Sequence, residues 1–304
     1  MRSRTTRTIV SLVCVGSTAT AFAENPFGAD EGKLHLTAGF SNVEGSGGGG
    51  LVPWAFVTGY GSEDSWGANT HFTSVQLGDY QLDSTGIAFG ILDRLEVSYT
   101  THDFVVTGTA LDGLSLSQDV IGLKVRLLGD AVYDQDRRMP QLAIGVERKR
   151  HGGIDAIGTP VAAVTSPLQL GARDEDGTDV YFAATKLFLE QNLLWNSTLR
   201  RTKANQFGLL GFGGDEDDDY SFELETTIGF VLSRRIAVGV EYRTKPDNLG
   251  VDEEGDAWDV FVAWTPTKNV SFVGAYVDVG PILGPATGQT QNQTGQYLSF
   301  QIGF

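Results

Sequence analysis

The sequence predicts an all-β protein, an antiparallel transmembrane β-barrel of the outer-membrane type with about 14 strands, short periplasmic turns and long external loops. Three observations predict this fold: an export signal, apolar residues that alternate with polar ones over segments of roughly ten residues, and an amphipathic last strand ending in Phe304. After Glu24 no run of about 18 apolar residues occurs, so a transmembrane helix is excluded. A membrane location therefore requires a barrel.

The first 23 residues have the features of a signal peptide. Arg2, Arg4 and Arg7 form a positive start, small and apolar residues follow, and Ala21-Phe22-Ala23 provides a cleavage site before Glu24. The sequence therefore divides into a signal peptide, 1–23, and a single transmembrane barrel domain, 24–304. The only cysteine, Cys14, lies in the signal, so no disulfide holds the mature chain together.

Composition excludes several classes of protein. The 304 residues include 22 Lys and Arg against 38 Asp and Glu, a net charge of −16, and this charge makes nucleic acid an improbable partner. With 41% hydrophobic and 10% aromatic residues, the chain has enough apolar surface to exclude general disorder.

The clearest strands form a hairpin late in the chain. From Tyr220 to Leu232 apolar residues alternate with polar ones, 233–235 turn the chain, and the alternation resumes from Ile236 to Tyr242. The same pattern elsewhere predicts strands over about 14 segments, which are approximately 33–42, 51–60, 66–77, 84–92, 95–106, 118–129, 140–149, 179–189, 193–202, 220–232, 236–244, 257–264, 270–279 and 295–304.

The connections support this assignment because short and long ones mostly alternate. With the amino terminus taken as periplasmic, the short ones lie near 61–65, 93–94, 131–139, 190–192, 233–235 and 265–269, and the longer ones include 150–178, 203–219, 245–256 and 280–294. Acidic clusters at 174–176, 215–219 and 252–254 fall in the longer set. The cluster 215–219 could attract calcium, but it matches no complete calcium-loop motif, so we expect solvated loops, no metal and no cofactor.

The last strand resembles the signal that the barrel-assembly machinery recognises, which makes that machinery an expected partner. Its apolar face consists of Leu298, Phe300, Ile302 and Phe304. Only about nine residues, 24–32, precede the first predicted strand, so no separate periplasmic plug domain is expected.

Four stretches resemble a family of exported proteobacterial proteins known only as a domain of unknown function. They are GGGGLVPW at 47–54, GDAVYDQDR at 129–137, ANQFGLLGFGG at 204–214 and YRTKPDNLG at 242–250. The resemblance covers nearly the whole mature chain and implies an outer-membrane barrel, without a substrate or catalytic residues.

Catalytic chemistry is not indicated, and we expect no enzyme. The chain has four histidines, His35, His71, His102 and His151, and none lies in a recognisable catalytic motif. His102, with Ser98 on the same face of its strand, is the best candidate, but a histidine without a catalytic role explains it more simply.

If the apolar residues face lipid, alternation directs charged side chains into the lumen, where water or a partner can satisfy them. They could line a polar channel or brace a closed interior with ion pairs. The lumen-lining candidates are Glu96, Lys124, Arg126, Glu147, Glu223, Glu225, Glu241 and Arg243.

The connection around 205–214 is too apolar to extend freely into water. We expect it to fold inward and line or plug the mouth of the barrel, with contact to lipopolysaccharide or another subunit as the alternative; its apolar residues are Phe207, Leu209, Leu210 and Phe212. Basic residues near the outer strand ends could meet lipid phosphates or serve as ordinary rim charges: Arg148, Lys149, Arg150, Arg200, Arg201 and Lys203.

Together these features favour a protein of the bacterial outer membrane, with outer-membrane lipid and lipopolysaccharide as partners. As function we expect a passive channel or transporter for small solutes or apolar compounds, with a non-conducting structural or adhesive barrel as the alternative. The sequence specifies neither the solute nor the oligomeric state.

Overall fold

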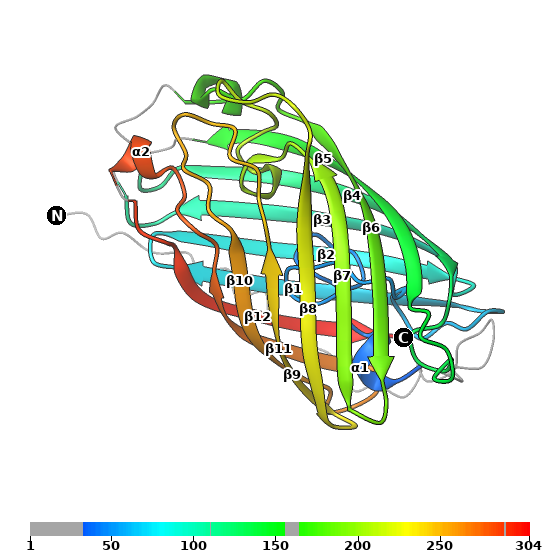
Figure 1. The fold of residues 1–304 in the computed structure, drawn as a ribbon. Helices are drawn as coiled ribbons and strands as arrows, with labels where there is room; N and C mark the ends of the chain where they lie inside the picture. The colour runs from blue at the N-terminus through cyan, green and yellow to red at the C-terminus, as the bar shows by residue number, and fades with distance from the viewer. Residues whose placement is uncertain (1–32, 110, 156–163, 289) are drawn as a thin grey trace.

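The structure, a computed structural model, describes residues 33–109, 111–155, 164–288 and 290–304. Within these residues, twelve strands form one closed antiparallel barrel, in which neighbours in sequence pair and β1 pairs with β12 (Figure 1). The strands are β1 (Trp66–Leu77), β2 (Tyr80–Ile91), β3 (Leu95–Val106), β4 (Ser115–Leu128), β5 (Gln141–Asp155), β6 (Gly177–Phe188), β7 (Leu193–Thr202), β8 (Ser221–Ser233), β9 (Ile236–Arg243), β10 (Ala257–Trp264), β11 (Val270–Asp278) and β12 (Thr294–Gly303).

The barrel has two different ends. The turn end carries Lys33, Phe304 and the connections β2–β3, β4–β5, β6–β7, β8–β9 and β10–β11. The loop end carries the other connections, with short helices α2 (Gly284–Thr287), η1 (Pro167–Leu170) and η2 (Asn205–Gly208). Among the described residues, no helix is both long enough and apolar enough to cross a bilayer.

Alternation along each strand separates an apolar outer face from a largely polar inner one. On β10, Trp258, Val260 and Val262 are exposed on the outside, whereas Asp259 and Phe261 point inward and are buried. This arrangement reverses that of a water-soluble barrel, in which the apolar face points inward.

Two of the predicted strands, 33–42 and 51–60, are not strands. These residues belong to the luminal segment, residues 33–65, which contains the short helix α1 (His35–Ala38) and lies inside the barrel (Figure 1). Because β1 pairs with β12, the ring has no free edge to which another strand could add. Isolated bridges, Ser41 with Gly47 and Gly48 with Pro53, fold the segment back on itself instead.

The prediction that only about nine residues, 24–32, precede the first strand is therefore wrong. The first strand starts at Trp66, so residues 33–65 come before it, and 61–65 lead into the barrel rather than joining two strands. The predicted signal peptide, 1–23, lies outside the described residues.

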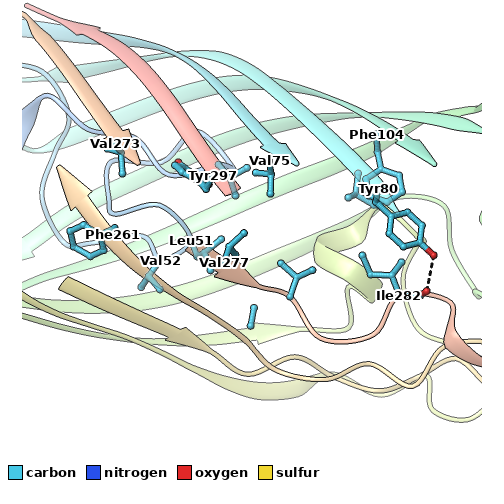
Figure 2. Packing of buried hydrophobic residues seen from close by; sticks show 14 of the residues in the cluster. Leu51, Val52, Val75, Tyr80, Phe104, Phe261, Val273, Val277, Ile282 and Tyr297 are labelled. Atoms are coloured by element: carbon cyan, nitrogen blue, oxygen red, sulfur yellow. Dashed lines mark hydrogen bonds between the residues drawn. The ribbon is translucent and has the colours of Figure 1, made fainter. Parts of the chain in front are cut away.

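Apolar side chains of the luminal segment pack against inward-facing residues of the wall. Leu51 and Val52 lie beside Phe261, Val277 and Tyr297 (Figure 2). Towards the loop end, the rings of Tyr80 and Phe104 stack with centroids 5.4 Å apart, and Tyr80 Oη donates to the carbonyl oxygen of Ile282 at 2.9 Å.

Candidate functional site

Glycines allow the luminal segment to approach the wall closely. Gly45 has φ +94°, which favours glycine, and a Cβ built there would lie 3.1 Å from the Cβ of Thr100. A Cβ on Gly49 would lie 1.9 Å from Oε1 of Glu241. Larger residues at these positions would move the segment away from its partners.

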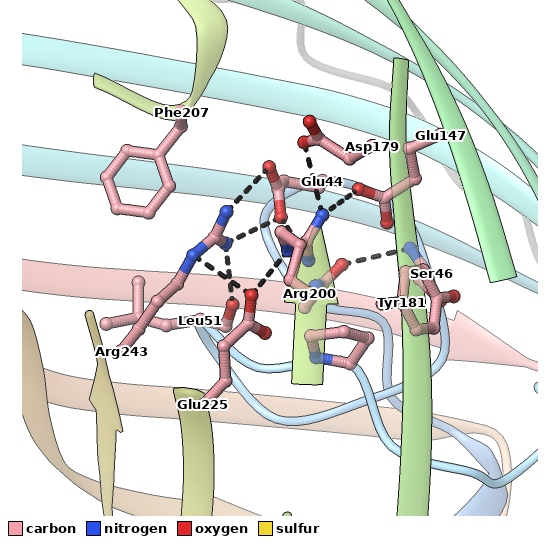
Figure 3. A network of polar contacts seen from close by, with 12 residues as sticks. Glu44, Ser46, Leu51, Glu147, Asp179, Tyr181, Arg200, Phe207, Glu225 and Arg243 are labelled. Atoms are coloured by element: carbon pink, nitrogen blue, oxygen red, sulfur yellow. Dashed lines mark hydrogen bonds and ion pairs between the residues drawn. The ribbon is translucent and has the colours of Figure 1, made fainter. Parts of the chain in front are cut away.

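Glu44 is the electrostatic centre of the luminal segment, and it is fully buried. Its carboxylate pairs with Arg243 of β9 at 2.6 Å and with Arg200 of β7 at 3.1 Å (Figure 3). It also pairs with Lys149 of β5. Three strands that are far apart in the sequence therefore hold one side chain of the segment.

The same three cations also contact carboxylates of the wall. Arg200 pairs with Glu147 at 2.6 Å and with Glu225 (Figure 3). Lys149 pairs with Asp179 at 2.7 Å. Oxygens of Glu44, Glu147 and Asp179 lie within 4.8 Å of one another, a spacing that would suit a metal ion. Lys149 and Arg200 already contact these oxygens, so the cluster is an ion-pair network rather than an unfilled metal site.

A second contact holds the backbone of the segment. Glu96 pairs with Lys124 at 3.0 Å and accepts N–H bonds from Gly47 at 2.9 Å and Thr58 at 2.8 Å. Lys124 donates to the carbonyl oxygens of Gly47 at 2.9 Å and Phe56 at 2.8 Å. This ion pair therefore binds backbone N–H and C=O groups at two places in the luminal segment, residue 47 and residues 56–58.

A third contact differs because it has no cation. Glu241 accepts the N–H of Leu51 at 2.7 Å and the hydroxyl of Thr227 at 2.7 Å. Its cross-strand neighbour Asp259 is fully buried and forms no ion pair with any described residue. Two adjacent carboxyl groups without a neutralising partner are costly in a dry interior.

The structure places the predicted lumen-lining residues as follows. Four of them contact the luminal segment directly: Glu96, Lys124, Glu241 and Arg243. Others lie apart from the segment: Glu147 and Glu225 belong to the wall side of the ion-pair network, Glu223 lies near the loop end bonded to Ser221 and Thr244, and Arg126 lies at the turn end bonded to Asp93 and Gly129.

Two of the six predicted rim cations face the lumen. Lys149 and Arg200 have the inward parity of their strands and are completely buried in the network, so they are unable to meet lipid phosphates. Arg148, Arg150 and Arg201 are exposed.

The apolar connection 204–214 covers the loop end of the lumen. Leu209 and Leu210 are buried in the same apolar cluster as the segment, and Phe212 is also buried. Phe207 is half-buried, its ring lies 4.5 Å from the guanidinium carbon of Arg243, and its carbonyl oxygen accepts a bond from Lys149 at 3.2 Å. The connection therefore lies directly over the Glu44 network.

A polar cluster ties this connection to the β9–β10 connection. The N–H of Gln206 donates to both carboxylate oxygens of Glu254 at 2.8 and 2.9 Å, and Lys245 donates to Oε1 of Gln206 at 2.8 Å. Burial raises the pKa of Glu254 to about 8 and lowers the pKa of Lys245. We name Gln206, Lys245, Asp252 and Glu254 the loop-end cap.

The enzyme candidate does not form a catalytic pair. His102 Nε2 lies 2.8 Å from the carbonyl oxygen of Val43, and Nδ1 lies 3.0 Å from Oε1 of Gln118. Ser98 is four residues away on the same strand, about 13 Å at the usual rise. Nε2 of His102 thus contacts the luminal segment at Val43, whereas Nδ1 contacts Gln118 of β4 in the wall.

An apolar cavity of about 660 Å³ remains at the turn end between the luminal segment and the wall. Sequence reasoning missed it, because its wall residues occupy inward positions expected to be polar: Leu194, Val231, Phe261, Ala263 and Val273. One feature of the sequence does indicate an apolar lumen here: in the run 230–232, inward-facing and outward-facing positions are both apolar.

Comparisons with solved structures find barrels of similar fold at low identity. The KdgM porin has a TM-score of 0.44 at 9% identity, covering 78% of this chain and 99% of that chain. The COG4313 outer membrane channel from Pseudomonas putida F1 gives 0.47 at 12%, covering 83% and 96%. Outer membrane phospholipase A from Escherichia coli gives 0.42 at 11%, covering 81% and 93%.

No curated protein matches the chain. A family model described as a protein of unknown function (DUF3034) matches residues 37–301, and this range includes most of the luminal segment as well as the strands. The chain therefore belongs to the DUF3034 family.

Proposed function

We propose that this protein is an outer-membrane barrel that passes small solutes or apolar compounds through its lumen when the luminal segment leaves its docked position. The outer face supports the membrane location. On β10, Trp258 and Trp264 lie six residues apart, about 20 Å along the strand, with exposed valines between them. Apolar residues flanked by aromatic ones are typical of strands that cross the outer membrane.

The observation that carries the proposal is the nature of the contacts inside the lumen. Beside the apolar contacts of Leu51 and Val52, polar contacts at Glu44, the Glu96–Lys124 pair and Glu241 hold the segment. Water can replace these ion pairs and hydrogen bonds when the segment moves. A polar lumen occupied by a separate stretch of chain fits a closed state of a conducting barrel.

The proposal can be tested with a reversible disulfide bond between the luminal segment and the wall. The Cβ positions at Gly45 and Thr100 lie 3.1 Å apart, slightly under the usual disulfide range, and the mature chain as predicted contains no cysteine. We expect Gly45→Cys/Thr100→Cys to show no openings in a planar bilayer when oxidised and to open when reduced. The single variant Gly45→Cys controls for strain at this position. Conductance by the oxidised protein equal to that of the reduced protein would contradict the proposal.

The alternative is a non-conducting structural or adhesive barrel, which the completely buried Glu44 network favours. Absence of openings in the reduced double variant and in Glu44→Gln, with both proteins showing the heat-dependent gel mobility of folded barrels, would support this alternative.

A further inference from the structure

The luminal segment leaves one part of the barrel unfilled, the cavity at the turn end. Its apolar lining comes from Phe40 and Trp54 of the segment and from Leu194, Phe261 and Val273 of the wall. A volume of about 660 Å³ is within the range of small-molecule sites, about 300 to 1,000 Å³. The cavity reaches the surface, because exposed Leu34 and Leu189 also line it.

The charge of the lining is the opposite of the charge of the chain. Basic groups occur at Lys33, His35 and Arg234, and none of the described lining residues is acidic, although acidic residues outnumber basic ones 38 to 22 overall. Lys33 pairs with Asp93 at 2.9 Å. Arg234 is exposed and makes no ion pair with any described residue, and Nδ1 of His35 is buried there without a hydrogen-bond partner.

We propose that this cavity binds a single-chain amphiphile with an anionic head, a long-chain carboxylate. The hydrocarbon tail lies among Phe40, Trp54 and Phe261, and the carboxylate lies at the turn end beside Arg234 and His35. An apolar interior with basic groups at its mouth is complementary to both parts of such a molecule. Binding at this site is independent of transport, since the cavity exists with the luminal segment docked.

Trp54 provides a direct reporter because it lines the cavity. A variant that keeps only this tryptophan, with phenylalanine at positions 66, 195, 258 and 264, is placed in lipid nanodiscs and titrated with a fatty acid brominated on its chain. We expect quenching of Trp54, reversed by dodecanoate. Across unbranched carboxylates from eight carbons upward, affinity should rise about fourfold per methylene until the cavity is full.

Two matched pairs of variants locate the tail and the head. Ala263→Leu fills the cavity and should lower the affinity for dodecanoate by about 50-fold, the equivalent of roughly three methylenes, whereas Val262→Leu, on the outer face of the same strand, should not. Arg234→Gln should lower the affinity for dodecanoate by about two- to fivefold and leave the affinity for dodecanol unchanged. Arg235→Gln, in the same turn but outside the lining, should affect neither ligand.

Three results would overturn the proposal: no quenching by the brominated fatty acid, equal loss of affinity in Ala263→Leu and Val262→Leu, or quenching of Trp54 by brominated phospholipid of the disc in place of the free acid. The last would identify a two-chain lipid. All three are equilibrium measurements on the docked state, so they are separate from the conductance of the locked barrel.

Discussion

Removal of the Glu44 charge should release the luminal segment. Glu44→Gln abolishes three buried ion pairs, with Lys149, Arg200 and Arg243. Breaking a buried pair by changing one partner typically costs about 3 to 5 kcal/mol. Each of the three cations keeps a wall carboxylate, Asp179 or Glu225, so we take the lower end, about 3 kcal/mol.

That free energy corresponds to about a hundredfold larger undocked population. The assay is maleimide labelling of Val43→Cys, a position that is buried next to Glu44 in the docked state. Labelling follows the undocked population when redocking is fast compared with the chemistry. In the Glu44→Gln background the labelling rate should rise about a hundredfold.

Glu147→Gln is the matched control, because it removes one negative charge from the same network but belongs to the wall. It should leave labelling of Val43→Cys within about threefold of the parent, since the contacts of Glu44 persist. Equal acceleration by the two substitutions would refute the reasoning, because it would mean that network charge rather than the Glu44 tether holds the segment.

The remaining predictions concern the third contact, the glycines and the loop-end cap. Asp259→Asn should stabilise the barrel by about 1 kcal/mol in urea unfolding, because it replaces one of two adjacent buried carboxyl groups, which repel each other when ionised, with a neutral amide. Gly49→Ala should weaken docking by about 1 to 3 kcal/mol, measured by the same labelling, since its Cβ meets Glu241. The raised pKa of Glu254, about 8, means that the docked cap holds its proton more tightly than the open one; cap stability is therefore greatest near pH 4.5 and falls as pH rises to about 8. The protection factor of the Gln206 amide, which corrects the hydrogen-exchange rate for the intrinsic effect of pH, should show this decline, and Glu254→Gln should abolish it.

Controls use positions of matched chemistry. Asp179→Asn removes a carboxylate that pairs with Lys149 at 2.7 Å, so it should destabilise the barrel. This effect is opposite in sign to the one expected for Asp259→Asn. Gly274→Ala should be tolerated, because its nearest side-chain atom, Cδ2 of Leu298, lies 3.8 Å away. Destabilisation of the barrel by Asp259→Asn, or a protection factor at Gln206 that does not fall between pH 4.5 and 8, would contradict the corresponding prediction.

The wall of the barrel was predictable because lipid and lumen impose opposite demands on alternate residues. Trp258, Val260 and Val262 follow that rule on the outside, and Glu241 and Arg243 follow it on the inside. The luminal segment was not predictable by this rule. Alternation from 33 to 42 is the same pattern as in a strand, but here Phe40 packs inside the barrel.

The sequence pattern also does not predict which charged side chains form ion pairs with one another inside the lumen. Parity directs Arg243 inward, but its partner Glu44 lies in a stretch without a period, 199 residues away. The apolar cavity depends on register, since Leu194 of β7 and Phe261 of β10 line it together only after the four strands β7 to β10 are placed side by side. Contacts between residues that are remote in sequence depend on the tertiary structure, so the periodicity of one strand does not predict them.

The carboxyl-terminal residue connects three parts of the chain. The carbonyl oxygen of Phe304 accepts N–H bonds from Ala68 of β1 at 2.7 Å and from Tyr60 of the luminal segment at 3.2 Å, and its own N–H donates to Ala68 at 2.9 Å. The seam between the first and last strands is therefore also a point at which the luminal segment is attached to the wall. Closure of the ring and docking of the segment share one residue, so a change at Phe304 should affect both together.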